Sequence, residues 1–106
     1  MASPFRPTGV YVPLVTPFDQ AGRVDLAALA GLADRVLASG AAGVVALATT
    51  GEPTSLDDAE REAVVAACAE ACARHGATLI VGAGTNDTRT TILRHEALAG
   101  VAGAKA

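Results

Sequence analysis

The sequence predicts an α/β fold made of three successive βα units, and two observations support this prediction. First, three apolar segments alternate with three segments of helical periodicity. Second, the ends of the apolar segments are evenly spaced, because Thr50 follows Thr16 by 34 positions and Gly84 follows Thr50 by 34 positions. Such units predict parallel strands joined by helical crossovers. The expected strands lie near 10–17, 43–50 and 78–84, and the expected helices lie near 25–39, 57–75 and 88–99.

The three expected strands are rich in Val, Leu and Ile, which pack well on a pleated surface. The second and third contain nearly continuous apolar stretches, VVALA and LIV, instead of a strict alternation of apolar and polar residues. Parallel strands that are covered on both faces have this pattern, so we expect both strands to be buried.

The first two expected helices carry start and stop signals. Asp25 can cap the first helix, and Gly40 follows that helix as a stop. Asp57 and Glu60 form an Asp-x-x-Glu capping box for the second helix, which is followed by Gly76. The residues expected to face inward are Leu26, Leu29, Leu32, Val36 and Leu37 in the first helix, Val64, Val65, Cys68 and Cys72 in the second, and Ile92, Leu93 and Ala97 in a third helix that starts at Thr88.

Repeated βα units of this kind favour either an open doubly wound sheet or part of a (β/α)8 barrel. A helical repeat array is excluded, because such arrays have no buried strand in each unit. The final stretch, LAGVAGAKA at 98–106, is expected to be the end of a helix or a loop without a fourth strand. Three parallel strands alone leave two unpaired edges. We therefore expect residues 1–106 to form one partial domain that is cut off between units.

Composition and charge exclude several classes of protein. The 106 residues carry a formal net charge of −3 and no cluster of Lys or Arg, so neither nucleic acid nor an anionic membrane is an expected partner. No apolar stretch approaches the roughly 20 residues that span a bilayer. No signal peptide is visible in residues 1–9, and we therefore expect a cytoplasmic protein.

The two cysteines and two histidines are candidates for a redox or metal site. Cys68 and Cys72 lie one helical turn apart, so they could form a redox pair or bind a metal together with His75. Their spacing matches none of the usual zinc motifs, and we expect two small buried residues instead. His75 and His95 are expected on the outer surface of the helices.

Hydroxyl side chains and a glycine follow the second apolar segment, at the edge where ligands bind in both parallel architectures. Thr49 and Thr50 carry neighbouring hydroxyls, and Gly51 lets the backbone approach a ligand closely. Hydroxyls and free N–H groups near the start of a helix favour a carboxylate or a phosphate. The alternative is that the threonines only favour a strand and the glycine only favours a turn. We expect Thr49 and Thr50 to end a strand, outside any helix, at the same rim as Thr16 and Gly84.

Two neighbouring features have alternative roles. Glu52 is either a general base or, as we expect, a residue that holds the loop by accepting backbone hydrogen bonds. GAGTND at 82–87 is similar to a dinucleotide-binding loop, but it lacks the third glycine of G-x-G-x-x-G. We expect a glycine-lined strand end there, with Asn86 near the mouth of the site and bonded to neighbouring loops.

Three segments of the chain together carry a family pattern. They are TGVYVPLVTPFDQAGRVD at 8–25, ASGAAGVVALATTGEPTSLDDAER at 38–61 and VGAGTNDT at 81–88. In this order they resemble the opening of the dihydrodipicolinate synthase / N-acetylneuraminate lyase family, and the pairing of TPF with TTGE one unit later is the most specific feature. Ala48 departs from the family pattern, which usually has glycine at that position.

The resemblance implies a complete (β/α)8 TIM barrel, of which this chain is the N-terminal three units. It implies a Schiff base between a lysine on a later strand and the keto group of pyruvate or a related 2-oxo acid, without a metal or organic cofactor. Carried over by position, Thr50 binds the keto-acid carboxylate, and Thr49 is the hydroxyl of a proton relay with two tyrosines. Thr16 and Gly51 shape the floor of the pocket. The resemblance also implies a homo-oligomer, either a tetramer or a dimer.

Paired threonines favour the dihydrodipicolinate synthase branch, which joins pyruvate to aspartate semialdehyde in lysine biosynthesis. The alternatives are N-acetylneuraminate lyase, a 2-keto-3-deoxy sugar acid aldolase, a non-catalytic truncated relative, or a phosphate- or nucleotide-binding α/β module. Lys105, the only lysine, lies on no expected strand, and Tyr11, the only tyrosine, lies in the first strand. We therefore expect the 106-residue chain alone to lack the catalytic amine and to be inactive.

Overall fold

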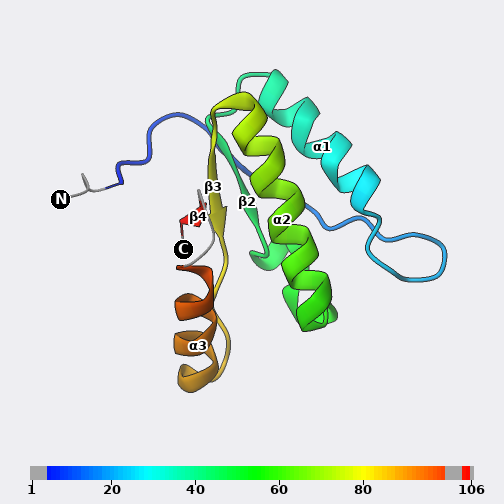
Figure 1. Ribbon diagram of the computed structural model, residues 1–106, viewed down its shortest axis with the longest axis vertical. Coiled ribbons are helices and arrows are strands. Elements are labelled where there is room, and N and C mark those ends of the chain that lie inside the picture. Colours follow the sequence, from blue (N-terminus) through cyan, green and yellow to red (C-terminus); the bar gives the residue numbers. More distant parts are fainter. Residues whose placement is uncertain (1–4, 100–103, 106) are drawn as a thin grey trace.

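The computed structural model describes residues 5–99 and 104–105, and its strands and helices alternate along the chain (Figure 1). The strands are β1 (Tyr11–Pro13), β2 (Gly43–Ala46), β3 (Thr78–Val81) and β4 (Ala104–Lys105). The α-helices are α1 (Leu26–Ala38), α2 (Asp58–His75) and α3 (Thr88–Leu98). Two single turns of 3-10 helix, η1 (Thr49–Gly51) and η2 (Pro53–Ser55), lie between β2 and α2.

The four strands form one sheet in the order β1-β2-β3-β4, and each neighbouring pair is parallel. In this register Val12 lies beside Val44, and Val45 lies beside Ile80. The predicted α/β fold with parallel strands is confirmed. The expectation of no fourth strand is wrong, because Ala104 and Lys105 pair with β3. The other residues of the last stretch, 100–103 and 106, lie outside the described residues, as does the start of the segment 1–9.

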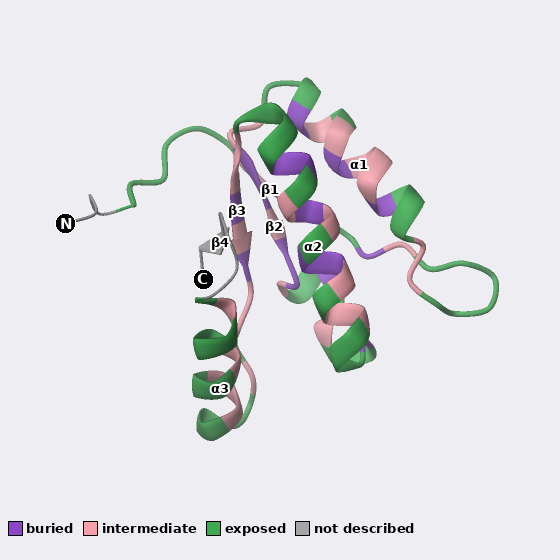
Figure 2. Cartoon of the chain, in the orientation of Figure 1, coloured by how far each residue is buried: buried purple, intermediate pink, exposed green. Residues whose placement is uncertain are grey.

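The core lies between the sheet and the layer formed by α1 and α2, whose buried stripes face the strands in Figure 2. Val44 and Leu79 of the sheet pack here against Leu29 of α1 and Val64 of α2, and each of these four side chains is at most 1 % exposed. The core is aliphatic, because it contains no aromatic side chain among the described residues. The folded state therefore depends on many small side chains instead of a few large rings.

The expectation that both faces of the strands are covered is wrong for the part of the chain that the structure describes. Val44 and Val81 face the helices and are buried, whereas their neighbours Val45 and Ile80 are only half-buried. Side chains alternate between the two faces of a strand, so α1 and α2 cover one face of this sheet. Val15, which follows β1, remains 51 % exposed.

The first two helices begin and end as their capping residues predict. The Asp25 carboxylate accepts a hydrogen bond from the Ala28 N–H at 3.0 Å at the start of α1. At the start of α2, Asp57 and Glu60 bond each other's backbone N–H groups at 2.7 and 3.0 Å, which completes the capping box. Gly76 ends α2 with a φ of 62°, a left-handed conformation that glycine adopts without strain.

The expected inner face of α1 is partly wrong. Leu29 and Leu37 are buried as expected, together with Ala33, whereas Leu26 at the first turn is 41 % exposed. In α2, Val64, Val65, Cys68 and Cys72 are all buried as expected, and Ala71 joins them.

The inner face predicted for α3 is also wrong. Ile92 and Leu93 are 52 % and 59 % exposed, Ala97 is exposed, and α3 has no buried residue. In Figure 1, α3 lies beyond the end of β3, apart from the layer that α1 and α2 form. A groove of about 650 Å³ lies between α2 and α3, lined by Val65 and Leu93 among others. Of the apolar residues of α3, only Leu98, at its end, is partly buried and packs against the core.

The strands are shorter than the expected segments, and each ends before the polar residues at the rim. Backbone pairing nevertheless continues for one residue after β1, because the Leu14 N–H donates to the Val45 carbonyl at 2.9 Å. It likewise continues after β3, because the Gly82 N–H donates to the Ala46 carbonyl at 2.9 Å. None of the helices in the described part of the chain is both long enough and apolar enough to cross a bilayer.

Candidate functional site

The chain leaves β2 through a bend that places Thr49 and Thr50 in a helical turn. Leu47 has a φ of 57°, a left-handed conformation that is uncommon for a residue other than glycine. The expectation that the two threonines end a strand outside any helix is therefore wrong, since they form the 3-10 turn η1 with Gly51. Glu52 also has a positive φ, 53°, so a left-handed residue lies on each side of the turn. Such conformations often mark functional sites, where the surrounding structure maintains them.

The turn is closed by its own backbone and presents two free hydroxyls. The Gly51 N–H donates to the Ala48 carbonyl at 2.8 Å, and the Glu52 N–H donates to the Thr49 carbonyl at 3.1 Å. Thr49 and Thr50 are exposed, and neither hydroxyl has a hydrogen-bond partner within residues 5–99. Both hydroxyls can therefore donate to or accept from a ligand.

Thr16 joins the turn to the loop that follows β1. Its hydroxyl donates to the Gly51 carbonyl at 2.7 Å, and Thr16 is only 5 % exposed. A Cβ atom at Gly51 would lie 3.3 Å from the Thr16 hydroxyl oxygen and 3.4 Å from the Leu14 carbonyl oxygen, so the backbone of the turn is closely packed here. The structure thus brings together Thr16, Gly51 and the two threonines, as the even spacing of the strand ends predicts.

Gly82, at the end of β3, supports the bend from the other side. A Cβ atom at this position would lie 2.4 Å from the Leu47 carbonyl oxygen, a separation that no real side chain tolerates. The close approach of β3 to Leu47 therefore requires glycine. Sequence reasoning did not identify Leu47, because nothing in its local sequence requires a left-handed conformation, but the glycines of VGAG indicated a close approach at this strand end.

The third loop at this rim is held by Thr85 of the loop and Thr91 of α3. The Thr85 N–H donates to the Thr91 hydroxyl at 3.0 Å, and the Thr85 hydroxyl donates to the Asp87 carbonyl at 2.6 Å. Asp87 caps α3, and hydrogen bonds from Thr90 hold the pKa of its carboxyl below the usual value. Asn86 is exposed, and its expected bonds to neighbouring loops are not present among the described residues.

Glu52 contributes to the loop through its backbone. Its carbonyl accepts a hydrogen bond from the Ser55 N–H at 3.0 Å, and its own N–H closes η1. Its carboxylate is exposed and accepts no hydrogen bond from the described residues, so the expectation that this carboxylate holds the loop is wrong. The left-handed backbone of Glu52 is what joins η1 to η2.

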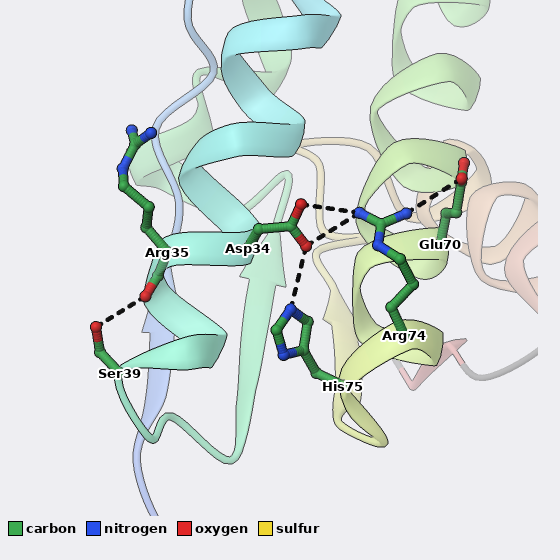
Figure 3. A network of polar contacts seen from close by, with 6 residues as sticks. All are labelled: Asp34, Arg35, Ser39, Glu70, Arg74 and His75. Carbon is green, nitrogen blue, oxygen red and sulfur yellow. Dashed lines mark hydrogen bonds and ion pairs between the residues drawn. The ribbon is translucent and has the colours of Figure 1, made fainter.

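The cysteines and histidines do not form a second site. Cys68 and Cys72 are buried free thiols, and burial, followed by the neighbouring Cys72, raises the pKa of the Cys68 thiol to about 11. Within the described residues, no group of three His, Cys, Asp or Glu side chains could hold a metal ion. His75 instead contacts Asp34 of α1 at 3.2 Å (Figure 3), and His95 is exposed on α3.

The sequence matches one family model, described as the dihydrodipicolinate synthetase family, over residues 6–106. A 4-hydroxy-tetrahydrodipicolinate synthase from Porphyromonas gingivalis is 44 % identical over 90 residues, which is 85 % of this chain and 30 % of that protein. A second, from Streptomyces coelicolor, is 46 % identical over 79 residues, which is 74 % of this chain and 26 % of that protein. The chain thus spans less than a third of the length of these curated relatives.

Solved structures of the same kind of enzyme share the fold. A prophage protein of the dihydrodipicolinic acid synthase family from E. coli K12, in complex with pyruvate, has a TM-score of 0.80 at 29 % identity. The match covers 92 % of this chain and 32 % of that protein. These neighbours are TIM-barrel enzymes, and the described strands and helices therefore correspond to about a third of such a barrel.

Proposed function

Because this chain belongs to the dihydrodipicolinate synthetase family, we propose that it forms the keto-acid-binding corner of a Schiff-base lyase or synthase. The observation that carries the proposal is the pair of free hydroxyls, Thr49 and Thr50, on a turn held at the carboxyl-terminal edge of the sheet. Hydroxyl groups held in place at a strand end suit an anionic substrate. The E. coli relative that holds pyruvate supports a 2-oxo acid as this substrate.

We assign different roles to the two threonines. Thr50 binds the carboxylate of pyruvate through its hydroxyl and backbone N–H, and Gly51 and Thr16 shape the floor beneath it. Thr49 transfers a proton between stronger groups, because a threonine hydroxyl is a poor base at neutral pH but can donate and accept at once. In the complete barrel, two tyrosines would be its relay partners.

The carbon–carbon chemistry needs an amine that condenses with the keto group, and the resulting imine withdraws electrons from the neighbouring carbon. In our proposal this amine comes from a later strand of the barrel. Lys105 is the only lysine of this chain, and its backbone lies in β4 opposite Ile80. Borohydride treatment of the 106-residue chain with pyruvate should therefore give no covalent adduct, and a stable adduct at Lys105 would contradict this assignment.

Within the family we propose a 4-hydroxy-tetrahydrodipicolinate synthase, which joins pyruvate to aspartate semialdehyde in lysine biosynthesis. The paired threonines and the relatives with this name support this choice over a sialic acid lyase or a sugar acid aldolase. The same proposal includes a homo-oligomer, as the family resemblance implies, and, separately from the resemblance, a cytoplasmic location. The comparison with TIM-barrel enzymes argues against a nucleotide-binding module.

A chimaera tests the proposal. Residues 6–99 of this chain would replace the matching part of the Porphyromonas gingivalis relative, and condensation of pyruvate with aspartate semialdehyde would be measured. We expect Thr50→Val to raise the KM for pyruvate about tenfold or more, because a hydrogen bond to a charged group is lost. We expect Thr49→Val to lower kcat by about 10²- to 10⁴-fold, since a proton-transfer step loses its relay.

Thr54→Val is the matched control, because Thr54 is an exposed threonine in the next turn, η2. It should change neither constant. The proposal would be wrong if the chimaera is active and the Thr49 and Thr50 variants behave like the Thr54 control.

A further inference from the structure

Arg61, in the first turn of α2, contacts the loop that leads away from the two threonines. Its Nη2 donates to the Pro53 carbonyl at 2.5 Å, and its Nε donates to the Leu56 carbonyl at 3.3 Å. The side chain is half-buried, and each contact spans several residues of the loop. Arg61 therefore fixes the turn η2 against the start of α2.

The turn η2 is continuous with the turn that carries the threonines. Glu52 ends η1 and also begins η2, so the two turns share this left-handed residue. The Ser55 N–H donates to the Glu52 carbonyl at 3.0 Å, and the Leu56 N–H donates to the Pro53 carbonyl at 3.3 Å. Since Arg61 binds the Pro53 carbonyl as well, a shift of its side chain would be passed to Glu52 and to η1.

The contact depends on the shape of the guanidinium group. Nε and Nη2 belong to one rigid planar fork, and here they reach two different carbonyl oxygens. A lysine ammonium is a point charge on a flexible side chain, so it cannot hold the same two carbonyl oxygens in a fixed geometry as the guanidinium does. Desolvation, followed by the charge of Arg94, lowers the pKa of Arg61, but an arginine remains protonated at neutral pH.

The turn needs such support because both of its ends are strained. Leu47 and Glu52 have positive φ angles, and residues of this kind keep that conformation only where neighbouring groups impose it. Thr16 holds the turn from the β1 side through the Gly51 carbonyl. On the α2 side, Arg61 is the side chain whose hydrogen bonds hold the loop carbonyls in the described part of the chain.

We propose that Arg61 is a positioning residue that holds Thr49 and Thr50 in their binding geometry from the start of α2. This inference rests on the proposed function for the choice of ligand, but the contact by which Arg61 fixes the loop is a property of the fold. Arg61 acts through Pro53 and Glu52 and does not touch the substrate.

Amide hydrogen exchange of the 106-residue chain, measured for each residue by NMR, tests without any ligand whether Arg61 fixes the loop. The reporters are the four loop amides whose N–H groups donate to backbone carbonyls. They belong to Gly51, Glu52, Ser55 and Leu56. We expect Arg61→Ala to accelerate exchange at these amides about tenfold relative to α2, because hydrogen bonds from a charged donor are lost. Arg61→Lys should restore part of the protection, with exchange about threefold faster than in the parent chain.

Arg74→Ala is the matched control, because Arg74 is an arginine at the opposite end of the same helix that makes ion pairs away from the loop. Arg74→Ala should accelerate exchange at the four loop amides no more than at the other amides of the molecule. The proposal is overturned if Arg61→Ala leaves the loop amides protected, if Arg74→Ala exposes them equally, or if they are unprotected in the parent chain.

A second readout uses pyruvate. Titration should shift the Thr50 amide signal in the parent chain, and Arg61→Ala should weaken the apparent affinity about tenfold, with partial recovery in Arg61→Lys. If the parent chain shows no shift with pyruvate while the exchange results hold, the isolated corner does not bind pyruvate, the positioning of the loop by Arg61 stands, and the chimaera decides the proposed function. If pyruvate binds equally to all three proteins, the positioning role fails and the proposed function stands.

Discussion

Single backbone positions determine how the threonine turn leaves the sheet. Leu47 bends the chain at the end of β2, and Gly82 makes room for its carbonyl group. Gly84, two residues further along, has open space around it. These two glycines are close in sequence, but an added methyl group would overlap the backbone of Leu47 only at Gly82. They are therefore a suitable pair for comparison.

Gly82→Ala should destabilise the fold by about 1–3 kcal/mol, because its Cβ would overlap the Leu47 carbonyl oxygen and force the bend to move. Gly84→Ala should change the free energy of unfolding by less than about 0.5 kcal/mol. Urea denaturation followed by circular dichroism would measure both. Equal stability of the two variants would show that β3 does not press on Leu47 as described.

The residues of the site differ in how far the sequence could predict them. Thr16, Thr50 and Gly51 could be placed at one rim because strands of equal spacing end at the same edge of a parallel sheet. The left-handed conformation of Leu47 could not be predicted, since it depends on β3 packing against it and not on its neighbours in sequence. The contact of Arg61 with Pro53 could not be predicted from the sequence either, because an arginine on a helix is usually a solvated side chain.

At the scale of elements, α1 and α2 are joined by their core residues and by a group of charges. Figure 3 shows Asp34 of α1 facing Arg74 and His75 of α2. Arg74 donates to both Asp34 carboxylate oxygens at 3.0 Å and also pairs with Glu70 at 3.1 Å. These groups lie on the solvent side of the helices, so salt screens their attraction.

The stability of this helix pair should depend on pH through Asp34. The hydrogen bond from Arg74, followed by that from His75, lowers the pKa of Asp34 in the folded chain, against the effect of desolvation. The stabilisation is therefore present above the unfolded pKa of about 3.9 and is lost as pH falls through the lower folded value. Asp34→Asn should lose this part of the pH dependence, measured as urea midpoints between pH 6 and pH 2.

Glu62→Gln provides the control for this experiment, because Glu62 is an exposed carboxyl of α2 that makes no ion pair among the described residues. It should keep the pH dependence of the parent chain. High salt should reduce the difference between Asp34→Asn and the parent, and a difference that is independent of both pH and salt would argue against an ionic contribution.

The helices also show where local sequence rules succeed and fail. The ends of α1 and α2 could be predicted because a cap depends on residues three positions apart. The inner face of α3 could not, because periodicity identifies an apolar stripe but not whether another element covers it. For the same reason the short strand β4 was missed, since two residues carry no periodic signal and β4 forms by pairing with β3.

At the scale of the whole molecule, one face of the sheet is covered and the other is open among the described residues. Ile92 and Leu93 of α3 add further exposed apolar surface. The relatives are about three times as long as this chain, and their remaining units are what would cover such surfaces in a closed barrel. Exposed apolar side chains that lie together favour association between copies.

The isolated 106-residue chain should therefore associate in a concentration-dependent way. Replacing Ile92 and Leu93 together with serine should lower the average mass measured by sedimentation equilibrium, because the exposed stripe of α3 becomes polar. The helical signal should be retained, since neither side chain is buried. An unchanged mass would show that α3 makes no contribution to association.

The hydrogen bond from Thr16 to Gly51 crosses from one βα unit to the next. If the second βα unit alone were recombined into another barrel, it would lack Thr16, whose hydroxyl holds the threonine turn. The smallest segment worth transplanting therefore runs from Leu14 to Gly82, so that it includes the donor Thr16, the threonine turn, Arg61 and the glycine that contacts Leu47. Crossover points in engineered hybrids belong outside that interval.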